Sequence, residues 1–240
     1  MRFEGVIFDL DGVLLSTDRL HYEAWKKMAE AEGIYFDFAI NERLRGVSRM
    51  ASLEIILEGA RRTYSEREKA ALAEYKNGLY RASLESLTPA DLFPGALDFL
   101  RHLLSLGLKL AIGSSSRNTK TILQRVGLAD LFRGAVSDGT NISRSKPDPE
   151  VFLKAAEMIA VPPKYCLVFE DAWAGIEAAR AANMTAVGIG TAARHPYARF
   201  GAPSIAALLE EQSGQYAELF RILEASAPAA RAGEAPAEQP

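Results

Sequence analysis

The chain has 240 residues, of which 48% are hydrophobic and 25% charged, which is enough apolar material for one or two globular domains. Its 28 basic and 31 acidic residues give a formal charge of -3. This near balance provides no overall field to attract nucleic acid or an anionic membrane, so we expect neither as a partner. Any phosphate site must therefore be locally basic.

The cysteine content and the N-terminal segment both argue against secretion. Cys166 is the only cysteine, so it cannot form an intramolecular disulfide, and we assign it to the apolar core. The apolar stretch 3–15 contains Glu4, Asp9 and Asp11, which are wrong for a signal peptide, and it is too short to span a bilayer. These features predict a cytoplasmic protein.

Apolar runs alternate with helical segments along the chain. The first run, 3–10, ends at the turn signal Asp11-Gly12 and is typical of a strand buried on both faces. Glycines and a proline mark the ends of the helical segments, and the alternation predicts a parallel sheet covered by helices. Later strands are predicted at 108–113, 134–137, 165–170 and 185–189, and helices at 95–106, 118–126 and 148–160.

One segment interrupts this alternation. Residues 18–86 are rich in Glu, Lys, Arg, Ala and Leu with helical periodicity and without a strand pattern, and 87–94 contains two prolines typical of a linker. From residue 225 onward large apolar side chains are almost absent, which is too little to offset the entropy of ordering. We therefore predict an α/β core at 1–15 and 90–224, a helical cap domain at 16–89 and a disordered tail at 225–240.

Polar residues of complementary chemistry follow several predicted strands. Ligands of open α/β sheets bind at the carboxyl ends of the strands, so we expect these side chains to meet. Taken singly, each has an ordinary explanation, since acids are common in turns and helix caps, serines in polar loops, and loop lysines are usually solvated. The set comprises Asp9, Asp11, Ser114, Ser115, Ser116, Lys146, Glu170 and Asp171.

Together these residues predict phosphoryl transfer. Carboxylate oxygens are hard ligands suited to Mg²⁺, and Asp9, Glu170 and Asp171 are the natural ligands. Lys146 and the Ser114 hydroxyl would neutralise the charge that spreads over a phosphoryl group in transfer. Asp9 could then attack phosphorus and become an aspartyl phosphate.

A weak dinucleotide fingerprint at Gly188-x-Gly190-x-x-Ala193 competes with this interpretation. It occurs late in the chain, and Pro196 follows where a phosphate-binding helix should run. We therefore do not assign a nucleotide to it.

The motifs Asp9-x-Asp11-Gly12, Ser114, Lys146-Pro147 and Glu170-Asp171 occur in the order of the four motifs of the haloacid dehalogenase (HAD) superfamily, which the chain resembles over roughly residues 1–220. The resemblance implies a Rossmann-like parallel sheet core of the HAD type with an inserted α-helical cap domain. It also implies Asp9 as the nucleophile and Lys146 as the charge stabiliser. Asp11 would be the general acid and base, and its backbone carbonyl a Mg²⁺ ligand.

Further residues resemble the β-phosphoglucomutase family within this superfamily. By this resemblance Thr17 lies at the cap hinge, and Lys76 contacts the sugar. Arg49 would grip the phosphate that is not being transferred, together with Ser116 and Asn118. The full set expected to bind substrate or phosphate is Thr17, His21, Trp25, Arg45, Gly46, Arg49, Lys76, Ser114, Ser115, Ser116, Arg117, Asn118 and Lys146.

Some of these positions have competing explanations or depart from the family pattern. Arg45 and Arg117 stand where the best-known member has lysine, and Met50 replaces an acidic residue. Arginine does not replace lysine freely where geometry matters. From the residues alone, Trp25 could pack in the cap core as well as contact a ligand. The cations of the cap could lie on a solvated helix face, and Arg117 and Asn118 could begin a helix.

The resemblance implies a mutase that interconverts β-D-glucose 1-phosphate and glucose 6-phosphate through β-D-glucose 1,6-bisphosphate, with Mg²⁺ as cofactor. We expect a monomer whose partners are small sugar phosphates and bisphosphates. The alternative is a HAD-type sugar-phosphate phosphatase, but water as acceptor requires no second phosphate grip, so Arg49, Ser116 and Asn118 favour the mutase. A non-enzymatic binding protein would leave the acid, lysine and serine set unexplained.

Overall fold

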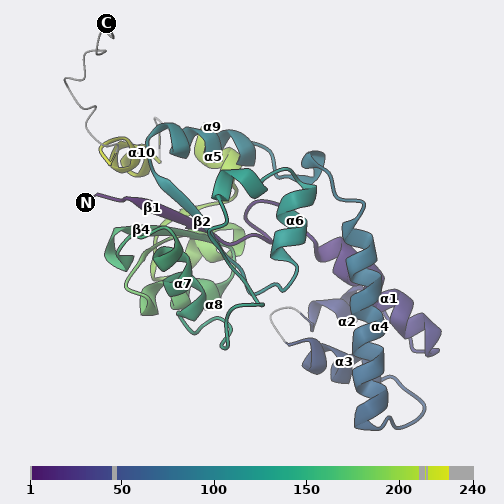
Figure 1. Cartoon of the computed structure of the whole chain (residues 1–240). Coiled ribbons are helices and arrows are strands. Elements are labelled where there is room, and N and C mark those ends of the chain that lie inside the picture. Colours follow the sequence, from purple (N-terminus) through teal and green to yellow (C-terminus); the bar gives the residue numbers. More distant parts are fainter. Residues whose placement is uncertain (1, 45–47, 211–213, 215, 227–240) are drawn as a thin grey trace, which may run out of the picture. The chain divides into compact units, whose positions relative to one another are not determined.

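The structure is a computed structural model that describes residues 2–44, 48–210, 214 and 216–226 (Figure 1). Contacts divide the chain into two compact units. We call them the sheet unit, within Met1–Leu15, Leu92–Lys120 and Leu128–Pro240, and the helical unit, within Ser16–Asp91 and Thr121–Gly127.

The sheet unit contains a six-stranded sheet in which every neighbouring pair of strands is parallel, in the order β3-β2-β1-β4-β5-β6. This arrangement confirms the predicted α/β fold with a Rossmann-like parallel sheet. The first five strands lie within the five predicted runs. The strands are β1 Gly5–Phe8, β2 Lys109–Gly113, β3 Val136–Ser137, β4 Cys166–Glu170, β5 Thr185–Ile189 and β6 Ala198–Ala202.

The sixth strand was not predicted. Among the strands that the structure describes, β6 lies at the edge of the sheet and pairs with β5 alone. Its sequence Ala-Arg-Phe-Gly-Ala is mostly half-buried or exposed, so it carries neither a continuous apolar run nor a strict alternation. An edge strand needs neither pattern, because only one of its sides is paired within the sheet.

Helices cover both faces of this sheet (Figure 1). On one face lie α7, Glu150–Met158, and α8, Trp173–Ala181. On the other lie α5, α9 and α10. The other helices of the sheet unit are α5 Ala96–Ser105, α9 Ile205–Glu210 and α10 Ala217–Glu224, with the 3-10 helices η2 Ala129–Phe132, η3 Pro163–Tyr165 and η4 Gly190–Arg194. α6, Thr119–Arg125, is divided between the two units.

Successive residues of a strand point to opposite faces of the sheet, so the side chains of neighbouring positions pack in two different cores. Phe8 and Phe169, from β1 and β4, stack with ring centroids 4.9 Å apart, and Phe99 of α5 meets both rings edge-on at 6.1 and 5.3 Å. Ile7 and Val168, one position earlier in each strand, belong to the other core, against α7 and α8. Burial on both faces explains why these strands read as continuous apolar runs.

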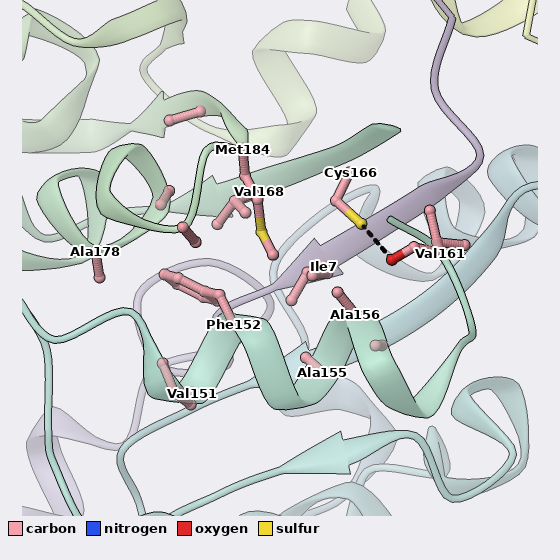
Figure 2. Close-up of a cluster of buried hydrophobic side chains, with 14 of the residues drawn as sticks. Ile7, Val151, Phe152, Ala155, Ala156, Val161, Cys166, Val168, Ala178 and Met184 are labelled. Atoms are coloured by element: carbon pink, nitrogen blue, oxygen red, sulfur yellow. Dashed lines mark hydrogen bonds between the residues drawn. The ribbon is translucent and has the colours of Figure 1, made fainter. Parts of the chain in front are cut away.

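Figure 2 shows the core on the α7 side, where Phe152 and Met184 pack around Ile7 and Val168. Cys166 is fully buried in this cluster, which confirms its assignment to the core. Its Sγ lies 3.9 Å from the Val161 carbonyl oxygen. Burial raises the pKa of the thiol to about 12, so the cysteine stays protonated and unreactive.

The helical unit consists mainly of α1 Asp18–Ala31, α2 Phe38–Glu42, α3 Arg49–Leu57 and α4 Glu66–Leu84, with the 3-10 helix η1 Pro89–Asp91. Its core includes Trp25 and Met28 of α1, Leu53 of α3 and Ala73 of α4. α4 begins with a capping box, in which Ser65 and Glu68 each accept a hydrogen bond from the other's backbone N–H.

The predicted cap limits of 16–89 and the predicted core limits remain proposals. The contact-defined helical unit also takes in Thr121–Gly127, a segment that the sequence assigned to the core. Of the predicted tail, Ala225 and Ser226 are described, and the buried Ser226 Oγ accepts a hydrogen bond of 2.8 Å from the Phe3 N–H. The rest of the tail lies outside the described residues. Among the described helices, none is both long and apolar enough to cross a membrane.

Candidate active site

The strand order defines where a ligand should bind. From β1 the chain first builds β2 and β3 on one side and then β4, β5 and β6 on the other. The carboxyl ends of β1 and β4 therefore form the switch point at which open α/β sheets bind ligands. Asp9 follows β1 directly and its N–H donates a 2.9 Å hydrogen bond to the Phe169 carbonyl, which places it beside Glu170 at the end of β4.

Four of the predicted site residues meet at this point. Asp9, Glu170 and Asp171 each offer one carboxylate oxygen, and these atoms lie within 4.8 Å of one another. The Lys146 Nζ donates hydrogen bonds to Asp9 Oδ1 at 2.5 Å and to Glu170 Oε2 at 2.8 Å. The Lys146 side chain is only 10% exposed, so the ammonium and its two partners are largely shielded from water.

Burial and charge act in opposite directions on these groups. Burial alone would lower the pKa of Lys146, but the charges of Asp9 and Glu170 outweigh it and raise the pKa above its ordinary value. Burial raises the pKa of Glu170 although Lys146 opposes the shift, and burial with the charge of Asp9 raises the pKa of Asp171 to about 7. The cluster thus holds more acid than its lysine neutralises.

This donor set fits a divalent cation. Three hard oxygen ligands converge at a spacing that one ion can bridge, and a dipositive ion would stabilise the ionised form of each carboxylate. Asp9, Glu170 and Asp171 therefore form a candidate metal site.

Two glycines make room for these acids. Gly12 has a φ of +85°, and a Cβ there would collide with the Asp171 carboxylate. A Cβ at Gly175, in the first turn of α8, would collide with the Glu170 side chain. Both positions therefore require glycine, and the Asp11-Gly12 pair serves close packing as well as the turn. Asp11 itself is half-buried in this turn.

The predicted serine loop follows β2, the other neighbour of β1, and so lies at the same edge of the sheet. Ser114 is buried, and its Oγ accepts a 3.2 Å hydrogen bond from the Ser116 N–H. The Ser116 Oγ in turn accepts one of 3.2 Å from the Asn118 N–H, directly before α6. Ser115 and Arg117 are exposed. The loop is thus shaped by its own hydroxyls.

A second group of predicted residues meets inside the helical unit. Lys76 of α4 is 3% exposed, and its Nζ lies 2.7 Å from His21 Nδ1 of α1. The same ammonium lies 4.7 Å from the centre of the Trp25 ring and 5.0 Å from that of Tyr80. The Tyr80 hydroxyl donates a 3.2 Å hydrogen bond to Thr17 Oγ1, and the Tyr80 ring stacks on His21 with ring centroids 3.9 Å apart, so Lys76, His21 and Thr17 all lie beside this one aromatic side chain.

Desolvation dominates this second cluster. Burial lowers the pKa of Lys76 to about 7, and the nearby charge of Arg49 adds to the shift. Burial also lowers the pKa of His21 to about 3, helped by Lys76 and Arg49. The burial of Lys76 contradicts the competing explanation that it is a solvated surface cation, and its role in substrate binding stays a prediction.

Arg49 is the first residue of α3 and remains 39% exposed. Its Nη2 donates a 3.0 Å hydrogen bond to Asn77 Oδ1, and its Nη1 lies 3.9 Å from Glu74 Oε2. Two further predicted residues, Arg45 and Gly46, lie outside the described residues. Tyr80 was missed from sequence, although its spacing of four from Lys76 places both on one face of a helix.

Comparison with known proteins assigns this fold, with its acid cluster at the carboxyl end of the sheet, to one class of enzymes. Residues 3–183 match the model of the haloacid dehalogenase-like hydrolases, and the chain belongs to this family. It is 46% identical to the beta-phosphoglucomutase of Bacillus subtilis (strain 168) over 189 residues, which cover 78% of this chain and 83% of the relative.

Other similar proteins include a phosphatase and a second beta-phosphoglucomutase. The chain is 32% identical to a fructose-1-phosphate phosphatase of Escherichia coli (strain K12) over 190 residues, which cover 78% of this chain and 97% of the phosphatase. The crystal structure of a beta-phosphoglucomutase from Clostridium difficile superposes with a TM-score of 0.77 at 36% identity, over 93% of this chain and 98% of that chain. The protein is thus a HAD-family enzyme, and its family includes both mutases and phosphatases.

Proposed function

We propose that this protein is a magnesium-dependent β-phosphoglucomutase, which interconverts β-D-glucose 1-phosphate and glucose 6-phosphate. The observation that carries the chemistry is the Lys146 ammonium held between the buried carboxylates of Asp9 and Glu170. The choice of mutase is supported by the 46% identity to the Bacillus subtilis enzyme.

In this proposal Asp9 carries the phosphoryl group. The C6 hydroxyl of β-D-glucose 1-phosphate attacks phosphorus on the phosphorylated Asp9 and gives its proton to Asp11, forming β-D-glucose 1,6-bisphosphate and free Asp9. After the bisphosphate exchanges its ends, Asp9 attacks the phosphorus at C1. The C1–O–P bond breaks at phosphorus, and Asp11 returns the proton to the C1 oxygen. Glucose 6-phosphate leaves and phosphorylated Asp9 is restored.

Lys146 has the role of an electrostatic stabiliser. A phosphoryl group in transfer spreads negative charge over its three equatorial oxygens, and a fixed ammonium beside the attacking Asp9 oxygen is well placed to balance that charge. The side chain stays protonated because its pKa is raised, so it acts as a charge and not as a base.

Mg²⁺ would be held by the carboxylates of Asp9, Glu170 and Asp171 and by the Asp11 carbonyl. When bound, it supplies positive charge to the phosphoryl oxygens. The resemblance to the β-phosphoglucomutases further assigns the non-transferring phosphate to Arg49, Ser116 and Asn118, and the sugar to Lys76.

The second candidate is a sugar-phosphate phosphatase, favoured by the 32% identity to the Escherichia coli fructose-1-phosphate phosphatase. In that reaction water takes the phosphoryl group from Asp9 and the isomer does not form. Exclusion of water from the aspartyl phosphate is what separates the two outcomes.

One assay distinguishes them. The enzyme is supplied with β- or α-D-glucose 1-phosphate, Mg²⁺ and trace bisphosphate, and glucose 6-phosphate and free phosphate are followed separately. We expect glucose 6-phosphate from the β anomer with little free phosphate. Stoichiometric free phosphate without glucose 6-phosphate would establish the phosphatase, and no turnover of either kind would refute both.

A further inference from the structure

Lys146 lies in the crossing segment 138–149 between β3 and α7, where the chain forms only turns, bends and irregular backbone. Its ammonium is nevertheless held within 2.5 and 2.8 Å of two buried carboxylates. Loop segments are generally more mobile than the elements they join, so this placement requires that the loop be fixed from outside.

Glu150, the first residue of α7, accepts several hydrogen bonds from the loop that carries Lys146. The Ser143 N–H lies 3.1 Å from each of its carboxylate oxygens, and the Ser143 hydroxyl donates to Oε2 at 2.8 Å. The Arg144 N–H donates to the same Oε2 at 2.8 Å. One carboxylate thus receives three donors from residues two and three positions before Lys146, and its side chain is only 12% exposed.

Lys154, one helical turn further along α7, completes the arrangement. Its Nζ donates to Glu150 Oε1 at 2.7 Å and also to the backbone carbonyl of Asn141, at the other end of the loop. Hydrogen bonds from Lys154 first, and from Ser143 next, lower the pKa of Glu150 to about 2. The carboxylate therefore remains a charged acceptor at every pH at which the enzyme would be assayed.

α7 is a firm anchor for this loop. Val151 and Phe152, directly after Glu150, are fully buried against the sheet (Figure 2). The Lys146 Nζ also lies 4.8 Å from the centre of the Phe152 ring. The same turn of helix thus holds the loop backbone through Glu150 and contacts the lysine head group through Phe152.

We propose that Glu150 is a positioning residue, which fixes the backbone at Ser143 and Arg144 so that the Lys146 ammonium stays between Asp9 and Glu170. This inference rests on the proposed function, because the position of Lys146 affects a rate only if a phosphoryl group is transferred at Asp9. A misplacement of about 1 Å can cost on the order of a hundredfold in rate.

The first test compares Glu150→Ala with Glu157→Ala, which removes an exposed acid of the same helix. We expect kcat to fall about ten- to a hundredfold in Glu150→Ala with KM changed less than about threefold, since Lys146 would act in the transition state. Glu157→Ala should match the wild type. Glu150→Gln keeps one acceptor oxygen and should recover part of the loss.

A double-mutant cycle then asks whether Glu150 acts through Lys146. Phosphorylation of Asp9 by acetyl phosphate is measured in single turnovers for Glu150→Ala, Lys146→Ala and the double variant. We expect Glu150→Ala to slow the reaction less than about threefold when Lys146 is already absent, because coupled residues are not additive. Independent effects that multiply would overturn the proposal.

Amide hydrogen exchange provides a readout that does not depend on activity. In Glu150→Ala, exchange of the peptide covering 143–147 should accelerate at least about tenfold, since two of its N–H groups lose their acceptor, whereas α8 should be unchanged. Unchanged exchange in 143–147 would also overturn the proposal. If the wild-type enzyme transfers no phosphoryl group, the proposed function fails, and the exchange experiment still decides whether Glu150 holds the loop.

Discussion

Each unit contains a lysine whose side chain is largely shielded from water, and the two lysines have opposite electrostatic properties. Lys146 in the sheet unit has two carboxylate partners, and its pKa lies above the ordinary value. Lys76 in the helical unit has a histidine and two aromatic rings around it, and its pKa falls to about 7. Burial is similar, so the neighbours determine whether a buried amine stays charged.

This difference suits two different tasks. A permanently charged ammonium is a fixed electrostatic partner for a group that gains negative charge, as in the proposed role of Lys146. An amine with a pKa near 7 lies close to the point at which it gains or loses its proton, so a bound anion nearby would shift it toward the charged form. The proposed sugar contact of Lys76 would therefore be sensitive to pH and to ligand.

Removing a partner of Lys146 should have the largest effect. Asp9→Asn keeps the shape of the side chain but removes both the attacking charge and one ligand of the candidate metal site, so we expect turnover to fall roughly 10³- to 10⁶-fold. The measurement is the steady-state rate with β-D-glucose 1-phosphate. Asp98→Asn, an exposed change of the same type on α5, serves as the control. Near-normal turnover of Asp9→Asn would rule out an aspartyl-phosphate mechanism.

The second largest effect should come from Asp171, the acid of the cluster that forms no ion pair with Lys146 among the described residues. Asp171→Ala should raise the Mg²⁺ concentration needed for half-maximal activity by at least about tenfold, because it removes one of three hard oxygen ligands. Glu177→Ala removes an exposed acid of α8 and should leave the Mg²⁺ requirement unchanged. Full activity of the wild type in a chelator would show that the metal assignment is wrong.

Replacing each lysine by methionine compares the two sites directly. Lys146→Met leaves two buried carboxylates without their ammonium, and losing one partner of a buried pair typically costs about 3 to 5 kcal/mol. Lys76→Met removes a buried amine that has no carboxylate partner among the described contacts, so we expect its free energy of unfolding to equal that of the wild type or to exceed it by up to about 1 kcal/mol. Urea unfolding at pH 7 in chelator measures both, and equal losses would contradict the comparison.

Much of the sheet unit and of its cluster could be predicted from sequence. Strands buried on both faces appear as continuous apolar runs, and the polar residues that follow such runs collect at one edge of a parallel sheet. For this reason the sequence alone predicts that Asp9, Lys146, Glu170 and Asp171 form one site. The edge strand β6 could not be found in this way, because it has only one paired side and little apolar sequence.

In the helical unit, the buried face of α4 could not be predicted from the sequence. In α4 the buried positions are Ala73, Lys76, Tyr80 and Leu84, which share one helix face at spacings of three and four. A lysine in such a stripe is normally counted as solvated, so the stripe was not recognised. The contacts of Glu150 were equally hidden, because they join a helix to an irregular loop, and no periodicity marks such a contact.

The comparison of the two lysines also predicts a difference in the pH dependence of stability. The pKa of Lys76 is about 7 in the folded protein against 10.5 for an ordinary lysine. Between these values the unfolded chain binds the proton and the folded chain does not, so folding becomes more favourable as pH rises from about 7 toward 10. The slope due to Lys76 can reach about 1.4 kcal/mol per pH unit. Lys76→Met removes this slope.

Lys146 should contribute no such slope in the same pH window. Its pKa is raised, so the stability from its pairing is complete below 10.5 and is lost only as pH rises through the still higher folded value. Across pH 7 to 9 it contributes no slope. The experiment is urea unfolding of wild type and Lys76→Met at several pH values in this window. If the stability difference between the two proteins stays constant with pH, Lys76 keeps its ordinary pKa and the contrast between the two buried lysines is wrong.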